Sequence, residues 1–148
     1  MKKILFVLFL LAVVVSACAS PASGPQITVE GVWGRNSPKM ATAGAFYMVI
    51  KNSGSEADKL VSATAEVCGT MELHESYMMD DGTMGMRPVT GGTIEIPAGG
   101  SVELKVGGLH VMCLDKTSEF ALGDTYPLKL VFEKAGEISV DAVIQDEP

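Results

Sequence analysis

The 148-residue sequence predicts a single all-β domain built as a sandwich or barrel. Short runs of apolar, β-branched and aromatic residues recur about every 8–12 residues, and clusters of Gly, Pro, Asn and Asp separate them. After the first 18 residues, no segment of ten or more residues keeps a helical period. The chain is also long enough to bury a hydrophobic core.

The expected strands follow one another along this domain. Residues 27–35 alternate loosely between apolar and polar, and residues 45–51 are rich enough in β-branched and aromatic side chains for a central strand. Shorter runs between turn signals predict the remaining strands at 59–65, 67–74, 93–96, 101–106, 109–114, 128–133 and 138–144. The Asp-Gly pair at 81–82 predicts a tight turn, so residues 77–86 are expected to form a hairpin with Met-rich flanks.

The first residues are typical of a secretory leader. Lys2 and Lys3 give a positive start, and residues 4–15 form an apolar run of twelve residues, which is too short for a membrane-spanning helix. Residues 15–18 (VSAC) resemble a bacterial lipobox, so Cys18 is predicted to be lipidated. An ordinary cleavage site beside an unrelated cysteine is the alternative.

The chain is therefore divided into three parts. Residues 1–17 are the predicted lipoprotein signal peptide, residues 18–25 a lipid-anchored flexible linker of small residues and Pro, and residues 26–148 the β domain. This division predicts an extracytoplasmic lipoprotein anchored to a membrane, either in a periplasm or at the outer face of the cytoplasmic membrane.

The charge balance is acidic. The chain has 11 basic and 18 acidic residues, and removal of the two leader lysines leaves 9 against 18, a net charge of −9. An acidic protein repels the phosphate backbone, so nucleic acid is not expected as a partner. The negative charge is interpreted mainly as a contribution to solubility.

Two cysteines remain if Cys18 is lipidated. Cys68 and Cys113 would then meet an oxidising compartment, where a disulfide between them is one interpretation. Two buried free thiols are the other, because the sequence does not give the Cα separation that a bridge requires.

Both histidines and most of the methionines lie between residues 71 and 112. In the strand predicted at 109–114, the period of two places His110 and Met112 on one face and Val111 and Cys113 on the other. His74, at the end of another strand, is expected to point away from the apolar side of that strand. These three side chains form a candidate metal site.

A methionine from the next hairpin would complete a set of two imidazoles and two thioethers. Thioether sulfur is a soft, neutral ligand that suits Cu(I), and imidazole suits copper and zinc, so the set favours copper. Met and His also bind without a thiolate, which would oxidise outside the cytoplasm. Met78 and Met79 are interpreted as lip residues for metal entry or as loop packing, and Met40 and Met48 as ordinary packing residues.

Several blocks of this sequence resemble the PCuAC family of periplasmic copper chaperones (DUF461 domain). These blocks are GAFYMVIKN at 44–52, MELH at 71–74, MRPV at 86–89, IPAGG at 96–100, GGLHVM at 107–112 and FEKAG at 132–136. The resemblance covers nearly the whole domain. It implies a single-domain, cupredoxin-like sandwich of the immunoglobulin-like Greek-key type that has no catalytic activity.

The family motif is a His, ten residues, a Met, twenty-one residues and then His-x-Met, and its four named residues hold Cu(I). Carried over, the resemblance implies His74, Met86, His110 and Met112 as ligands. The spacing departs from the motif, since eleven residues separate His74 from Met86 and twenty-three separate Met86 from His110. The extra residues are assigned to loops. Met84 remains an alternative to Met86 because it has the same strand parity.

The resemblance implies a Cu(I) carrier that delivers copper to an acceptor. The expected acceptor is the CuA subunit of cytochrome oxidase during its assembly, with a Sco-type protein as a further partner and a membrane contact through the lipid anchor. Copper buffering or resistance without a dedicated acceptor fits the same residues. A blue-copper electron carrier is disfavoured, because it needs a Cys beside its histidines and Cys113 lies on the opposite face from His110.

Overall fold

The computed structural model describes residues 24–147. The predicted signal peptide, Cys18 and most of the linker lie outside the described residues. Ten strands and no helix occur in the described part, which confirms the all-β prediction. The strands are β1 (Ile27–Arg35), β2 (Gly44–Asn52), β3 (Asp58–Thr64), β4 (Thr70–Met78), β5 (Met84–Pro88), β6 (Ile94–Ile96), β7 (Ser101–Leu104), β8 (Leu109–Leu114), β9 (Thr125–Phe132) and β10 (Gly136–Gln145).

Most predicted strands are confirmed, with ends that differ by at most three residues. The exception is β4, which was expected at 67–74 and instead runs from Thr70 to Met78. Its start is delayed by a turn in which the Cys68 N–H donates to the Ala65 carbonyl at 3.1 Å. β4 ends later than predicted because it stays paired with β5 as far as Met78, which lies opposite Met84 next to the hairpin turn. Among the described residues, no helix is long and apolar enough to cross a membrane.

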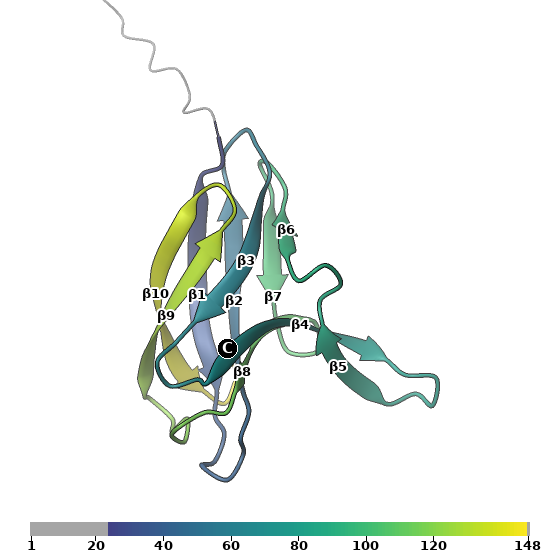
Figure 1. Ribbon diagram of the computed structural model, residues 1–148, viewed down its shortest axis with the longest axis vertical. Helices are drawn as coiled ribbons and strands as arrows, with labels where there is room; N and C mark the ends of the chain where they lie inside the picture. The colour runs from purple at the N-terminus through teal and green to yellow at the C-terminus, as the bar shows by residue number, and fades with distance from the viewer. Residues whose placement is uncertain (1–23, 148) are drawn as a thin grey trace, which may run out of the picture.

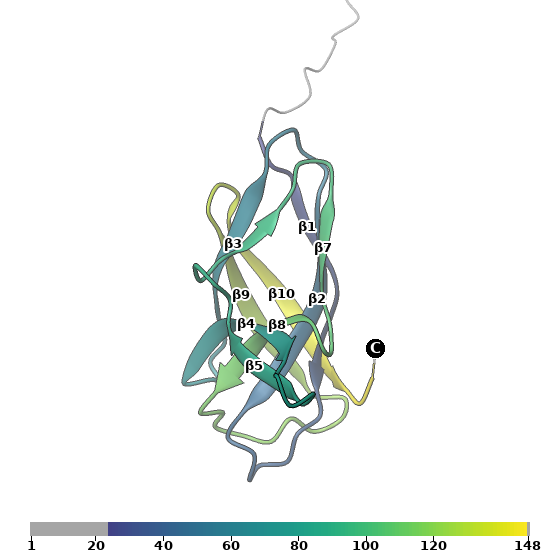
Figure 2. The ribbon, with the colours of Figure 1, turned by 90° about the vertical axis from the view of Figure 1, so that its right-hand side faces the viewer.

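The strands form one hydrogen-bonded path in the order β5-β4-β8-β2-β1-β10-β9-β3-β6, and β7 pairs with β2 off this path. Only β1 and β10 pair in parallel. Figures 1 and 2 show this sheet folded over on itself, so that β3 and β9 form one layer and β2, β7 and β8 lie in the other. The β4–β5 hairpin projects from the body of the sandwich (Figure 1).

The core lies between the two layers. In β2, Phe46 and Ile50 are fully buried and face Leu128 and Leu130 of β9 within one hydrophobic cluster, which Val111 of β8 also joins. Alternation along each strand then places the neighbours of these residues on the opposite face of the sheet. Among the described residues, the side chains of this cluster come from β2, β3, β4, β6, β7, β8, β9 and β10 and from the connections between strands.

One buried carboxylate anchors the closing β9–β10 hairpin. Asp58, at the start of β3, is 1% exposed and accepts backbone hydrogen bonds from Lys59 at 2.8 Å, Lys134 at 2.9 Å and Ala135 at 2.9 Å. Burial acts against the charged form, but these donors together hold the pKa of Asp58 below its ordinary value. The carboxylate therefore ties β3 to a turn more than seventy residues away.

The Asp58→Asn variant should test this anchor. The amide has one acceptor oxygen in place of two, so at least one buried backbone N–H loses its partner at a cost of about 1–3 kcal/mol. We expect the free energy of unfolding, measured by urea denaturation, to fall by that amount. Asp141→Asn is the matched control, since Asp141 is exposed on β10. Equal stability of the two variants would contradict the assignment.

Candidate metal centre

Antiparallel pairing of β4 with β8 sets the two histidines opposite each other. In this register His74 pairs with His110, and Glu72 pairs with Met112. Directly opposed residues project from the same face of a sheet, so all four side chains share one face. That face is the outer one, because the alternating residues Leu73 and Val111 belong to the core.

The hairpin partner strand adds methionines to the same face. Met86 of β5 pairs with Ser76, and Met84 pairs with Met78, two and four positions beyond His74. The exposed fractions are 61% for Met86 and 53% for Met84. The structure thus brings His74, His110, Met112 and the hairpin methionines onto one face, with the thioethers of the hairpin toward solvent.

The two histidines are buried, in contrast to the exposed methionines of the hairpin. His74 is 9% exposed and His110 is 2% exposed. Their rings continue a row of aromatic side chains across β1, β2, β8 and β4, with centroid separations of 4.6 Å from Trp33 to Tyr47, 6.2 Å from Tyr47 to His110 and 5.8 Å from His110 to His74. Burial raises the pKa of the Tyr47 phenol, so this ring remains neutral beside the histidines.

Glu72 fixes the orientation of His74. The His74 Nε2 atom lies 2.7 Å from Glu72 Oε2. An ionised carboxylate can only accept, so Nε2 carries the proton and donates, and the lone pair of a neutral imidazole is then on Nδ1. A carboxylate behind a histidine is the usual arrangement for a metal ligand, because it fixes the tautomer and raises the basicity of the ring.

A backbone carbonyl does the same for His110. The His110 Nδ1 atom lies 3.0 Å from the Gly108 oxygen, which can only accept, so the lone pair of the neutral ring is on Nε2. Burial lowers the pKa of His110; the Gly108 hydrogen bond raises it in part, and the nearby His74 lowers it further. His110 is consequently neutral, as a metal ligand must be, at neutral pH.

The two lone-pair atoms have no partner in the protein. His74 Nδ1 and His110 Nε2 are buried side-chain atoms without any hydrogen bond. An unsatisfied buried polar atom is costly and unusual, so an unpartnered nitrogen on both rings fits a pair of metal-binding imidazoles. With ring centroids 5.8 Å apart, an ion at about 2 Å from a nitrogen of each ring fits between them.

The other candidate ligands on this face are thioethers. In the part of the chain that the structure describes, no three His, Cys, Asp or Glu side chains are grouped so that they could hold a metal ion. Met86 and Met112 instead line one pocket of about 190 Å³ together with Ala45 and Tyr47, and Met84 does not line it. The set of two imidazoles and two thioethers is soft and neutral, which suits Cu(I).

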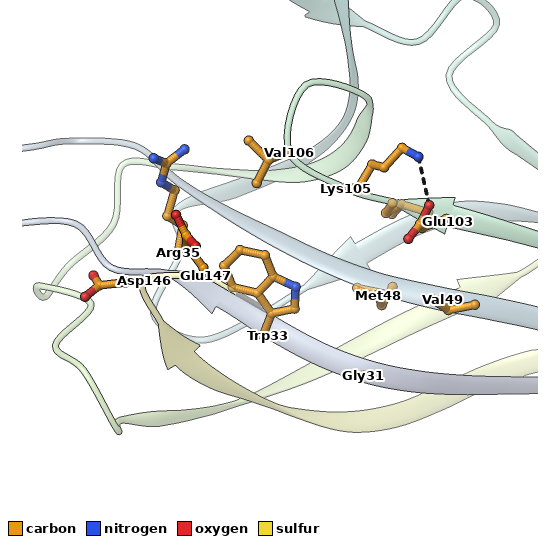
Figure 3. Close-up of a pocket in the computed structure, with 11 residues that line it drawn as sticks. Gly31, Trp33, Arg35, Met48, Val49, Glu103, Lys105, Val106, Asp146 and Glu147 are labelled. Atoms are coloured by element: carbon orange, nitrogen blue, oxygen red, sulfur yellow. Dashed lines mark hydrogen bonds and ion pairs between the residues drawn. The ribbon is translucent and has the colours of Figure 1, made fainter.

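A larger pocket lies elsewhere and contains none of the predicted ligands. It has a volume of about 530 Å³ and lies along β1, β2 and β7, with Trp33 and Met48 on its walls. Figure 3 shows its rim, where Lys105 Nζ donates to Glu103 at 2.9 Å. It has no free imidazole or thiolate, so its chemistry is that of an apolar recess with a charged edge.

The structure joins Cys68 to Cys113 in a disulfide, with the Cα atoms 5.4 Å apart. The sequence left this bridge and two free thiols open. The bridge closes a loop of 45 residues that contains all four predicted ligands. The chain-entropy model gives such a loop roughly 4 kcal/mol of stabilisation. Cys113 adjoins Met112 in β8, so the bridge also fixes the strand that holds two of the ligands.

Two residues of the site were not assigned a role from the sequence. The two-residue period of a strand places Glu72 on the same face as His74, so the position of Glu72 could have suggested an orienting carboxylate. The Gly108 carbonyl could not have been identified, because backbone acceptors leave no signal in the residue type. Met48 is packed in the core as expected, whereas Met40 is 96% exposed, so its interpretation as a packing residue is wrong.

Fold and site define a small all-β domain that presents paired imidazoles and thioethers on one face of its sheet. The chain belongs to the LpqE-like family, whose sequence model, described as "Putative lipoprotein LpqE-like", matches residues 27–144. A protein of Leifsonia xyli subsp. xyli (strain CTCB07), described as "Putative lipoprotein Lxx21020", is 27% identical over 125 residues, which cover 84% of this chain and 72% of that protein.

Solved PCuAC domains have the same fold. The apo PCuAC domain from PmoF1 is 30% identical, with a TM-score of 0.69 over 82% of this chain and 94% of that one. The copper-bound PCuAC domain from PmoF2 is 27% identical, with a TM-score of 0.67 over 86% and 97%. The Cu(I) form of DR1885 from Deinococcus radiodurans is 26% identical, with a TM-score of 0.56 over 89% and 83%. The PCuAC resemblance and the predicted cupredoxin-like sandwich are confirmed.

Acidification should destabilise the metal-free domain through His110. Since its pKa is lowered in the folded state, the unfolded chain takes up the proton more readily. The stability that neutral His110 contributes is present above the ordinary pKa of about 6.5 and is lost as the pH falls through the lower folded value. We expect the Tm to drop by a few degrees between about pH 7.5 and pH 5.5 in thermal denaturation. The drop should be smaller in His110→Gln, and an equal drop in both proteins would contradict this assignment.

Proposed function

We propose that this protein is an extracytoplasmic Cu(I)-binding metallochaperone whose ligands are His74, Met86, His110 and Met112. The observation that carries the proposal is the pair of buried imidazoles, each with its N–H occupied and its lone pair unpartnered. Copper is the cargo of this site. The soft, neutral donor set favours Cu(I) over harder cations, and two similar structures are of a copper-bound and a Cu(I) protein.

The pocket geometry favours Met86 over Met84 as the third ligand. Met86 lines the same recess as Met112 and Tyr47, although neither histidine lines it, whereas Met84 lies two residues closer to the hairpin tip and does not line it. Turns between the strands, such as the one at Gly91 and Gly92 with φ of 82° and 69°, can take up the extra residues relative to the family motif. Insertions in turns leave the facing strands in register.

The placement of the ligands suits transfer more than permanent storage. His74 and His110 are buried, Met112 is partly buried and Met86 is 61% exposed, so an acceptor can reach the ion from the side of Met86. We infer a protein tethered by lipidated Cys18 that hands copper to an acceptor, with the CuA subunit of cytochrome oxidase as the proposed acceptor and a Sco-type protein as the alternative. The likeness to PCuAC domains, one of them copper-bound, supports a carrier.

The competing functions differ in chemistry. A blue-copper electron carrier needs a thiolate beside its histidines, but Cys113 is bonded to Cys68 and lies on the core side of β8. Copper buffering or resistance uses the same ligands and differs only in the lack of a dedicated acceptor. A test of copper transfer to an acceptor therefore distinguishes copper buffering or resistance from the chaperone function.

An anaerobic Cu(I) competition titration of the chain lacking residues 1–18 tests the site. We expect one tight site, weakened about 100-fold or more by His110→Ala or Met112→Leu, since even orienting residues behind a ligand are worth roughly 10–100-fold in affinity. Met86→Leu should weaken binding more than Met84→Leu, and circular dichroism checks that each variant is folded. Unchanged affinity in the folded His110 and Met112 variants would overturn the site.

A transfer assay tests the chaperone function. The Cu(I)-loaded chain is mixed under argon with the metal-free CuA domain of oxidase, and the proteins are then separated and analysed for copper. We expect copper in the CuA domain, and its CuA absorption after mild oxidation, because an open thioether side allows ligand exchange. Free Cu(I) at the concentration released by the loaded chain is the control. Copper that stays with the carrier would favour buffering and contradict delivery.

A further inference from the structure

The β4–β5 hairpin is unusual for the apolar side chains that it exposes. It projects from the sandwich, as Figure 1 shows. Four methionines lie on it or in its turn. Their exposed fractions are 64% for Met78, 40% for Met79, 53% for Met84 and 61% for Met86. None of the four belongs to the hydrophobic core or packs against it. Burial therefore does not account for them.

One face of this hairpin has a structural explanation. Gly85 gives room to Tyr77 and Met79, since a Cβ atom at Gly85 would lie 2.9 Å from the Met79 methyl and 2.9 Å from the Tyr77 ring. The Arg87 guanidinium lies 4.5 Å from the centroid of the Tyr77 ring, and its Nε donates to Glu75 at 2.8 Å. Met79 is thus a packing residue on a face made of side chains in mutual contact.

The other face consists of the remaining three methionines. Met78 pairs directly with Met84, and Met86 follows Met84 by two residues on the same side of β5. Opposed residues have Cβ atoms about 4.5–5.5 Å apart, and alternate residues of a strand are about 7 Å apart. The flexible methionine side chain can span these separations, so three sulfur atoms can converge on one ion.

We propose that Met78, Met84 and Met86 form a second, weaker Cu(I) site at the tip of the hairpin, through which copper enters and leaves the histidine site. This inference rests on the proposed function. Met86 is shared between the two sites, so a second ion is held mainly by Met78 and Met84 when the histidine site is full, which makes the hairpin site the weaker one. The face that bears the three methionines continues through His74 to Met112. The ion moves by exchange of neutral ligands: Met78 and Met84 dissociate as the imidazole nitrogens bind, and neither an electron nor a proton is transferred.

Methionine-methyl NMR of the chain lacking residues 1–18, titrated with Cu(I) under argon and in parallel with Ag(I), tests the second site. With one equivalent of metal we expect the methyl signals of Met86 and Met112 to shift. Beyond one equivalent the signals of Met78 and Met84 should shift, while Met79 and the distant Met40 stay unchanged. Unshifted Met78 and Met84 signals with excess metal would overturn the proposal.

The double variant Met78→Leu/Met84→Leu separates sulfur chemistry from apolar surface, because leucine preserves the hydrophobic character and removes the sulfur. We expect the second equivalent to bind about tenfold or more weakly and the first within about twofold of the parent. Cu(I) release to an excess of a chelator should slow several-fold. Met40→Leu/Met79→Leu is the matched control and should behave like the parent. Parent-like binding and release in the double variant would indicate a protein-contact surface and overturn the metal site.

The two proposals fail in different ways. If the histidine site is wrong, the first equivalent binds as tightly to His110→Ala as to the parent. If only the hairpin site is wrong, His110→Ala loses the first equivalent and the hairpin methionines remain unaffected by metal.

Discussion

The pairing of β4 with β8 is the interaction on which the site depends, because it sets His74 opposite His110. Each ring has an acceptor behind it, the Glu72 carboxylate or the Gly108 carbonyl, so both lone pairs are directed away from these acceptors. A slip of one residue in either strand would turn the histidines into the core and bring Leu73 or Val111 to the surface. The hydrophobic core therefore enforces the geometry of a polar site on the other side of the same sheet.

The disulfide and the hydrophobic core both stabilise this register, and both lie on the same side of β8. Cys113 pairs with Met71 across the strands and bonds to Cys68 in the preceding turn. An oxidising compartment makes such a bridge stable, and a site without thiolate ligands leaves both cysteines available for it. The two kinds of sulfur therefore have different roles. The cysteine sulfurs stabilise the fold as a disulfide, and the methionine sulfurs, which bind without deprotonation, remain available to the metal.

Strand parity was predictable from the sequence, whereas strand pairing was not. The period of two alone placed His110 with Met112 and His74 with Glu72, since parity depends only on local geometry. The meeting of the two histidines depends on a register between strands 36 residues apart, which hydrophobic alternation restricts but does not determine. For the same reason the sequence left Met86 and Met84 open: both have the right parity, and only three-dimensional proximity to Met112 distinguishes them.

For the proposed Cu(I) site, the gradient of exposure along this face explains how one site can hold an ion and still release it. The imidazoles are almost fully buried and pre-oriented, so they contribute affinity at little entropic cost, whereas Met86 is 61% exposed on a projecting hairpin. An acceptor ligand approaching from the hairpin side can replace Met86 first while both histidines still bind. Because ligands are exchanged one at a time, the ion is never without ligands, and a tight site does not require a slow exit.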